Sequence, residues 1–110
     1  MRLLVCGGRH YHDEARVYAT LDRLKPKTII EGGATGADLL AQAWAIDNEV
    51  DCETYFAEWK KHGRAAGAIR NARMLSEGKP DLVVAFPGGC GTADMVRRAQ
   101  TAGIKVEIVE

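Results

Sequence analysis

Short apolar runs and longer amphipathic stretches alternate along the chain. Residues 3–6 predict a short buried β-strand, residues 28–30, 52–57 and 82–86 predict the next three strands, and the alternating apolar and polar positions of residues 105–109 predict an edge strand. After each of the first four strands, apolar residues spaced three or four positions apart predict a helix. The helices are expected from Asp13 to Leu24, from Thr35 to Glu49, from Arg64 to Ser76 and from Thr92 to Ala102.

Several residues mark the expected boundaries of these elements. Asp13 is suited to cap the first helix, and Thr35 followed by Asp38 has the form of a capping box at the start of the second. Gly78 is expected at the C-cap of the third helix. The segment WKKHG at residues 59–63 predicts a polar loop.

The strict alternation of strands and helices predicts one α/β domain over residues 1–110. Parallel neighbours need crossover connections, which are almost always right-handed, so we expect a Rossmann-like, three-layer α/β/α fold around a five-stranded parallel sheet. The expected strand order is 3-2-1-4-5. This order places the loops after strands 1 and 4 in one crevice at the carboxyl ends of the strands, with the loop after strand 2 beside them.

Glycine-rich turns follow three of the predicted strands, in LLVCGGR (3–9), IIEGGATGAD (29–38) and LVVAFPGGCGTAD (82–94). Glycine lets backbone amides approach a ligand, and the unpaired N–H groups at a helix N-terminus favour an anion. The turns therefore predict a phosphate site, although they are also compatible with tight strand-to-helix connections alone. Neither a Walker loop nor G-x-G-x-x-G is present, which disfavours a triphosphate–Mg²⁺ site and an ordinary dinucleotide site.

The candidate ligand-binding residues lie in these turns and near them. Arg9 and Arg70 are suited to bind phosphate through their guanidinium groups, and Glu31 is placed to accept ribose hydroxyls. Asp38 either caps its helix or contacts the ligand. The full set is Gly7, Gly8, Arg9, Gly32, Gly33, Ala34, Thr35, Gly36, Asp38, Trp59, Arg70, Asn71, Pro87, Gly88, Gly89, Gly91 and Thr92.

Other polar and reactive residues have two interpretations each. Trp59 and His62 either form a lid that stacks a base and meets a phosphate, or Trp59 packs the edge of the domain. His10 and His12 suggest a metal pair, but no third ligand has a suitable spacing, so a surface turn is favoured and no metal site is expected. Cys90 lies where a helix N-terminus favours a thiolate, or it is a small inert residue of the turn.

Charge and hydropathy limit the expected partners. The 15 basic residues balance 15 acidic ones, so no net field draws the chain to nucleic acid or to an anionic membrane. No apolar run approaches the length of a membrane span. We therefore expect a cytoplasmic protein whose partner is a nucleotide-like small molecule, with no cofactor of its own.

The motifs VCGGR (5–9), GGATGAD (32–38), W-x-x-H-G (59–63), RNARML (70–75) and FPGGCGTADM (86–95) resemble the YspA-like, cpYpsA-related branch of the SLOG superfamily. This superfamily also groups the DNA-uptake protein DprA with the LOG phosphoribohydrolases. The resemblance implies a Rossmann-like fold that binds a nucleotide or nucleotide-derived ligand, as a sensor or processor in bacterial and phage conflict systems. The LOG relatives are dimers or larger, so a homodimer is implied as well.

The LOG enzymes cleave N-glycosidic bonds with the pattern PGGxGTxxE and an arginine from the preceding helix. Residues 87–92 fit this pattern and Arg70 matches the arginine, but Met95 stands at the position of the glutamate. Asp94 points about 100° away from that position on an ideal helix.

Three functional hypotheses follow from the motifs. The leading hypothesis is a module that binds or senses a nucleotide without turnover. The second is an N-glycosidase or phosphohydrolase that acts on a nucleoside monophosphate or an ADP-ribose-type ligand, with Arg70 and a carboxylate from Glu31, Asp38 or Asp94 as candidate catalytic groups. The third, DprA-like binding of single-stranded DNA, is disfavoured by the neutral charge.

Overall fold

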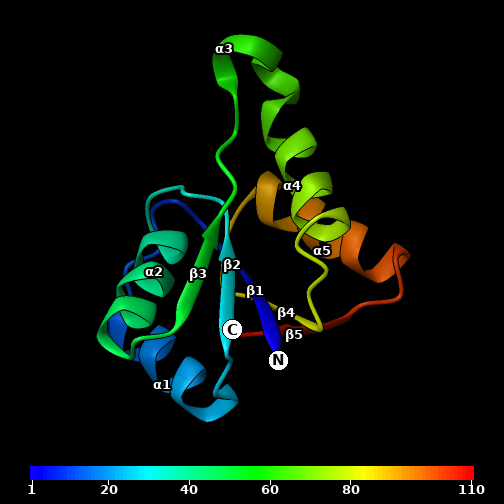
Figure 1. The fold of residues 1–110 in the computed structure, drawn as a ribbon. Coiled ribbons are helices and arrows are strands. Elements are labelled where there is room, and N and C mark those ends of the chain that lie inside the picture. Colours follow the sequence, from blue (N-terminus) through cyan, green and yellow to red (C-terminus); the bar gives the residue numbers. More distant parts are fainter.

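A five-stranded parallel sheet forms the centre of the computed structural model, which describes residues 1–110 (Figure 1). The strands follow the order β3-β2-β1-β4-β5. This order and the parallel pairing confirm the predicted sheet and its Rossmann-like topology. The strands are β1 (Arg2–Cys6), β2 (Thr28–Glu31), β3 (Asp51–Thr54), β4 (Leu82–Ala85) and β5 (Lys105–Ile108).

Helices cover both faces of the sheet. Figure 1 shows α1 and α2 on one face and α4 and α5 on the other, and each pair is in contact. No helix is both long enough and apolar enough to cross a lipid bilayer. The helices are α1 (Glu14–Leu24), α2 (Ala37–Asp47), α3 (Trp59–His62), α4 (Ala66–Ser76) and α5 (Cys90–Thr101), with a short 3₁₀ turn at Gly63–Ala65.

The core has two layers because successive strand residues point to opposite faces of the sheet. Leu3 and Val5 of β1 pack under α1 and α2, in a cluster that also contains Trp44. Leu4 packs on the other face under α4 and α5, in a cluster that contains Met95. The apolar runs of the strands are therefore buried on both sides, as parallel sheets require.

Two helices begin at residues other than those predicted. A capping box at Thr35 was expected for α2, but the Thr35 hydroxyl donates a hydrogen bond to the Arg9 carbonyl at 2.8 Å, and Gly36 occupies the N-cap. The start of α5 was expected at Thr92, but the helix begins at Cys90 with Gly89 as its N-cap. In both cases a glycine cap without a side-chain bond replaces the expected hydroxyl.

The loop predicted at residues 59–63 is wrong, because Trp59–His62 form α3. The Glu58 carbonyl accepts hydrogen bonds from the Lys61 and His62 amides at 3.0 and 2.9 Å, which closes one helical turn. The strand before it stops at Thr54, three residues earlier than its predicted end at residue 57. The chain from Phe56 onwards leaves the sheet, so α3 lies beyond the carboxyl end of β3 (Figure 1).

The third predicted helix ends at Ser76 as expected but begins later. The α-helix starts at Ala66 rather than Arg64, because Gly63–Ala65 form the 3₁₀ turn. Gly78 was expected at the C-cap, but Glu77 occupies that position, and the left-handed backbone follows at Lys79, with φ 48°. Gly78 serves close packing instead, since a Cβ there would clash with the Met74 carbonyl.

Backbone hydrogen bonds join the loops after β1, β2 and β4. The Gly8 amide donates to the Pro87 carbonyl at 2.8 Å, and the Ala37 amide donates to the Gly8 carbonyl at 3.2 Å. Gly36 has φ 77°, and a Cβ at this residue would clash with the Gly8 carbonyl. The β1 loop is therefore fixed from both sides, at the carboxyl ends of the strands.

We expect Gly36→Ala to destabilise the protein more than Gly103→Ala does. Gly103 has φ 76° and open space around its Cβ position, so alanine there adds only backbone strain, about 1–2 kcal/mol. Alanine at residue 36 brings the same backbone strain and also overpacks against the β1 loop, which destabilises the protein by about 1–3 kcal/mol more. Urea unfolding of both variants measures the difference, and equal losses would show that the loops do not press on each other.

Candidate functional site

A cleft of about 710 Å³ opens at the carboxyl ends of β1 and β4. We call it the β1–β4 cleft. Its walls come from the loop after β1, the start of α2, α3, α4 and the loop into α5. The lining residues are Val5, Cys6, Gly7, Gly8, Arg9, His10, Tyr11, Ala34, Asp38, Trp59, Arg70, Asn71, Met74, Pro87, Gly88, Gly89, Cys90, Gly91 and Thr92.

The start of α5 carries unpaired backbone donors into this cleft. The amides of residues 88–92 donate no hydrogen bond within the protein. Gly89 and Gly91 have open space at their Cβ positions, so no side chain covers these amides. Unpaired N–H groups and the positive end of a helix dipole together favour an anion of phosphate size.

Three amides of the loop between β2 and α2 are hydrogen-bonded within the protein. The Gly32 and Ala34 amides each donate to Asp38 Oδ2 at 3.2 Å, and the Gly33 amide donates to Glu31 Oε1 at 2.7 Å. Only Ala34 and Asp38 of this loop region line the cleft, whereas the predicted binding residues Gly32, Gly33, Thr35 and Gly36 do not.

The β1 loop also contributes fewer donors than its glycines suggest. Gly7 and Gly8 line the cleft, but the Gly8 amide is bonded to the Pro87 carbonyl. A Cβ on Gly7 would meet Ala37 and Phe86, so this glycine allows close packing of the loops. Of the three glycine turns, the one before α5 is the main source of free amides.

Asp38 is the only acidic side chain that lines the cleft. Its side chain is buried, at 6% exposure. Burial raises the pKa of Asp38 to about 7, and the charge of Glu31 acts in the same direction, against the Ala34 amide and Arg70. Burial likewise raises the pKa of the neighbouring Cys6 thiol to about 12. Burial therefore favours the protonated forms of these two side chains.

The structure places two predicted catalytic residues away from the cleft. Glu31 is fully buried, and its carboxylate accepts hydrogen bonds from the Thr54 hydroxyl and the Gly33 amide. Asp94 accepts from Asn71 Nδ2 at 3.0 Å and Arg98 Nε at 2.8 Å. Burial opposes its ionisation, but these bonds prevail and lower the pKa of Asp94.

Arg70 and Asn71, the third catalytic candidate and its neighbour, do line the cleft. Arg70 Nη1 donates to the Gly32 carbonyl at 2.7 Å, and Arg70 Nε donates to Asn71 Oδ1 at 3.1 Å. Asn71 Nδ2 in turn donates to the Gly91 carbonyl at 3.2 Å. This chain of bonds links the β2 loop, α4 and the first turn of α5, and so positions the free amides.

Other lining residues were missed or were given another role. His10 and Tyr11 follow Arg9 in the β1 loop, so their proximity to the glycine turn was the available signal. The Tyr11 ring stacks on Phe86, with ring centroids 5.5 Å apart. Trp59, a predicted residue, is 60% exposed at the rim. Val5, Cys6, Met74 and Cys90 complete the missed set.

Comparison with known proteins agrees with the expected resemblance. The family model described as YspA, cpYpsA-related SLOG family (YAcAr) matches residues 1–62, more than half of the chain. The Gene 61 protein of Mycobacterium phage D29 is 38% identical over 117 aligned positions, which cover 96% of this chain and 93% of that protein. The matched range of the family model contains the β1 and β2 loops, and the phage protein aligns with nearly the whole chain.

We expect Asp38→Asn to stabilise the protein in a pH-dependent way. In the unfolded chain Asp38 ionises near the ordinary aspartate pKa of 3.8, but the folded carboxyl keeps its proton up to about pH 7. The wild-type free energy of unfolding should therefore fall as pH rises through this window and stay lower above it. Asparagine carries no charge and its Oδ1 can still accept from the two loop amides.

The measurement is Tm as a function of pH for both proteins. The Tm of Asp38→Asn should exceed the wild-type Tm by about 4 °C or more above neutral pH, and by less at acidic pH. Asp51→Asn, at an exposed aspartate of β3, is the matched control. A Tm difference that is independent of pH would contradict a protonated Asp38.

Proposed function

The chain belongs to the YspA, cpYpsA-related SLOG family, and from this premise we propose that the β1–β4 cleft binds a nucleotide or nucleotide-derived ligand through a phosphate group. The observation that carries the proposal is the run of unpaired amides at residues 88–92, which face the cleft without side-chain cover. A phosphate accepts several hydrogen bonds at once, so a row of free donors suits it better than a neutral group.

The side chains near these amides suit the rest of such a ligand. The Thr92 hydroxyl lies against the Gly88 backbone and adds a donor beside the amides. Arg9 lines the cleft and supplies a positive charge for the phosphate. Trp59, exposed at the rim, offers an aromatic face on which a base can stack.

The positions of the acidic side chains support binding or sensing without turnover. Met95, at the position of the LOG glutamate, is fully buried in the core beneath α5. Glu31 and Asp94 are both held by hydrogen bonds away from the cleft. The cleft can therefore hold a phosphate without presenting the carboxylate that the LOG route requires.

We expect Gly89→Val to abolish phosphate-dependent binding and to leave the fold intact. Gly89 has φ −101° and nothing within 4 Å of its Cβ position, so valine fits the protein but occupies the space in front of the amides. Affinity should fall by about tenfold or more, the value of at least one hydrogen bond to a charged group. The measurement is the rise in Tm caused by AMP, ADP-ribose or NAD.

Ala93→Val provides the matched control, because this exposed residue lies one turn into α5 and does not line the cleft. It should keep the wild-type response to the same ligands. Equal ligand-induced stabilisation in the wild type and both variants would place the binding site elsewhere.

A second candidate function, hydrolysis of an N-glycosidic bond, is favoured by one observation. Asp38 is the only carboxyl group that lines the cleft, and its pKa of about 7 allows it to exchange a proton near neutral pH. In such a reaction water attacks C1′ and gives a proton to Asp38, while the C–N bond breaks and the base leaves with the bonding electrons.

The hydrolase hypothesis predicts that the protein releases adenine and ribose 5-phosphate from AMP. Asp38→Asn should then reduce the rate by about 10²-fold or more, the usual contribution of a general base, whereas Asp51→Asn should not. Chromatography of the products measures both. A ligand that binds the cleft and is recovered unchanged after long incubation would leave binding as the function.

A further inference from the structure

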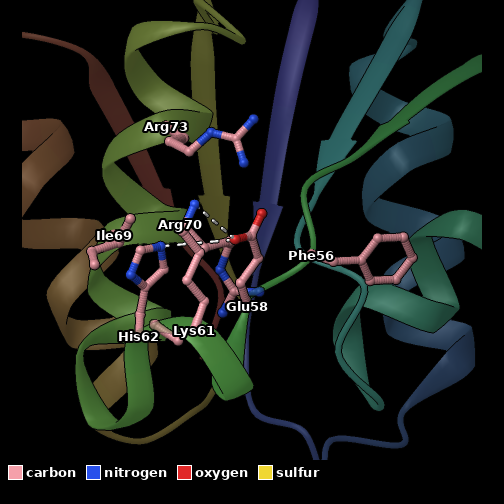
Figure 2. Close-up of a pocket in the computed structure, with 8 residues that line it drawn as sticks. Phe56, Glu58, Lys61, His62, Ile69, Arg70 and Arg73 are labelled. Atoms are coloured by element: carbon pink, nitrogen blue, oxygen red, sulfur yellow. Dashed lines mark ion pairs between the residues drawn. The ribbon is translucent and has the colours of Figure 1, made fainter.

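A smaller hollow of about 270 Å³ lies beside the β1–β4 cleft, between α4 and the segment that leads from β3 into α3 (Figure 2). We call it the α3–α4 hollow. The side chains drawn in Figure 2 come from these two segments and gather around a common centre, except for the Phe56 ring, which points away from the others. The lining residues are Phe56, Glu58, Lys61, His62, Ala66, Ile69, Arg70 and Arg73.

Positive charge exceeds negative charge in this hollow. Lys61, Arg70 and Arg73 are basic, and Glu58 is the only carboxyl group among the lining residues. The formal net charge of the whole chain is zero, so the excess is a local feature rather than a general property of the surface. A concave surface of one sign concentrates ligands of the opposite charge.

Glu58 marks the position that an anion would take. Figure 2 shows its carboxylate among the basic side chains, and its Oε2 lies 3.8 Å from Lys61 Nζ and 3.9 Å from His62 Nε2. Arg73 Nε donates to Glu77 Oε2 at 2.8 Å, outside the lining of the hollow, and this bond chiefly, with a smaller effect of Glu58, raises the pKa of Arg73. The Glu58 side chain is 51% exposed and its ion pairs are long, so they hold it weakly. A ligand anion with better geometry can replace it.

Arg70 connects the hollow to the β1–β4 cleft, because its side chain lines both. The same helix presents Asn71 and Met74 to the cleft, and Ile69 and Arg73 to the hollow. The two spaces therefore lie on adjoining sides of α4. Arg70 is the side chain that a ligand occupying both spaces would contact in each.

We propose that the ligand of the β1–β4 cleft carries a second phosphate, separated from the first, and that Lys61, Arg70 and Arg73 bind it in the α3–α4 hollow. This inference rests on the proposed function and narrows its ligand class. The class comprises nucleotides phosphorylated at two separate positions and short linear dinucleotides with a 5′-phosphate. In both, a ribose separates the two phosphates.

Titration calorimetry of the whole chain with a series of adenine nucleotides tests the proposal. AMP carries one phosphate, and ADP carries two that are adjacent. Adenosine 3′,5′-bisphosphate and the 5′-phosphorylated diadenylate carry two that are separated, and comparison of these two distinguishes a mononucleotide from a dinucleotide. At low salt, at least one of them should bind about tenfold or more tightly than AMP and ADP, and this gain should shrink as salt is added.

Two substitutions in the hollow should change that gain in opposite directions. Lys61→Glu reverses a lining charge and should remove most of the gain, whereas Glu58→Gln removes the competing carboxylate and should increase it. Lys60→Glu is the matched control, because this exposed neighbour makes the same charge change on α3 but does not line the hollow. Affinity for AMP should be the same in all variants.

The outcomes separate this inference from the proposed function. AMP binding that Gly89→Val abolishes, with no tighter binding of either ligand with separated phosphates, would overturn the second phosphate site and leave the proposed function intact. Equal effects of Lys61→Glu and Lys60→Glu on the bisphosphate would overturn it as well. If none of the nucleotides binds the wild type, both proposals fail.

Discussion

The contact among three backbone loops at the carboxyl end of the sheet is the constraint on which the candidate site depends. The Gly8 amide donates to the Pro87 carbonyl, and the Gly8 carbonyl accepts from the Ala37 amide, so main-chain bonds join the loops after β1, β2 and β4. Main chain can approach main chain this closely only where a side chain is absent, and a Cβ at Gly36 or Gly88 would clash with the β1 loop. Glycine at these positions is therefore required by the assembly of the site, before any ligand is considered.

Hydrogen bonds within the three loops also determine which backbone amides remain unpaired. A backbone amide that is buried in the protein needs an acceptor, and the loop after β2 finds its acceptors in the carboxylates of Asp38 and Glu31. The β1 loop uses Pro87 in the same way. The first turn of α5 is different, because its amides belong to a helix start that no side chain caps and that opens into the cleft. The turn before α5 therefore keeps more unpaired amides than either of the other two glycine turns.

This inequality also explains how much could be predicted from the sequence. A parallel sheet follows from the alternation of strands and helices and from the handedness of crossovers, which are general rules, and the expected strand order is confirmed. Which glycine turn keeps free amides depends on acceptors distant in sequence, such as the Pro87 carbonyl for Gly8, and no local pattern contains that information. Thr35 illustrates the same limit. Its spacing to Asp38 matches a capping box, but its hydroxyl donates to the Arg9 carbonyl across the loop contact, and the helix start moves to Gly36.

Arg70 ties the loop after β2 to α4 at the wall of the cleft. Its guanidinium donates to the Gly32 carbonyl and to Asn71, so it holds the β2 loop to α4 in the absence of any ligand. A phosphate that draws Arg70 towards itself must compete with the Gly32 carbonyl for the same N–H group. Such a ligand would bind with different free energies when the β2 loop is bonded to Arg70 and when it is not. A ligand shifts a conformational equilibrium only under this condition. A neutral ligand without a group for Arg70 lacks this difference. Arg70 is therefore the side chain through which the proposed phosphate would act on the loop after β2.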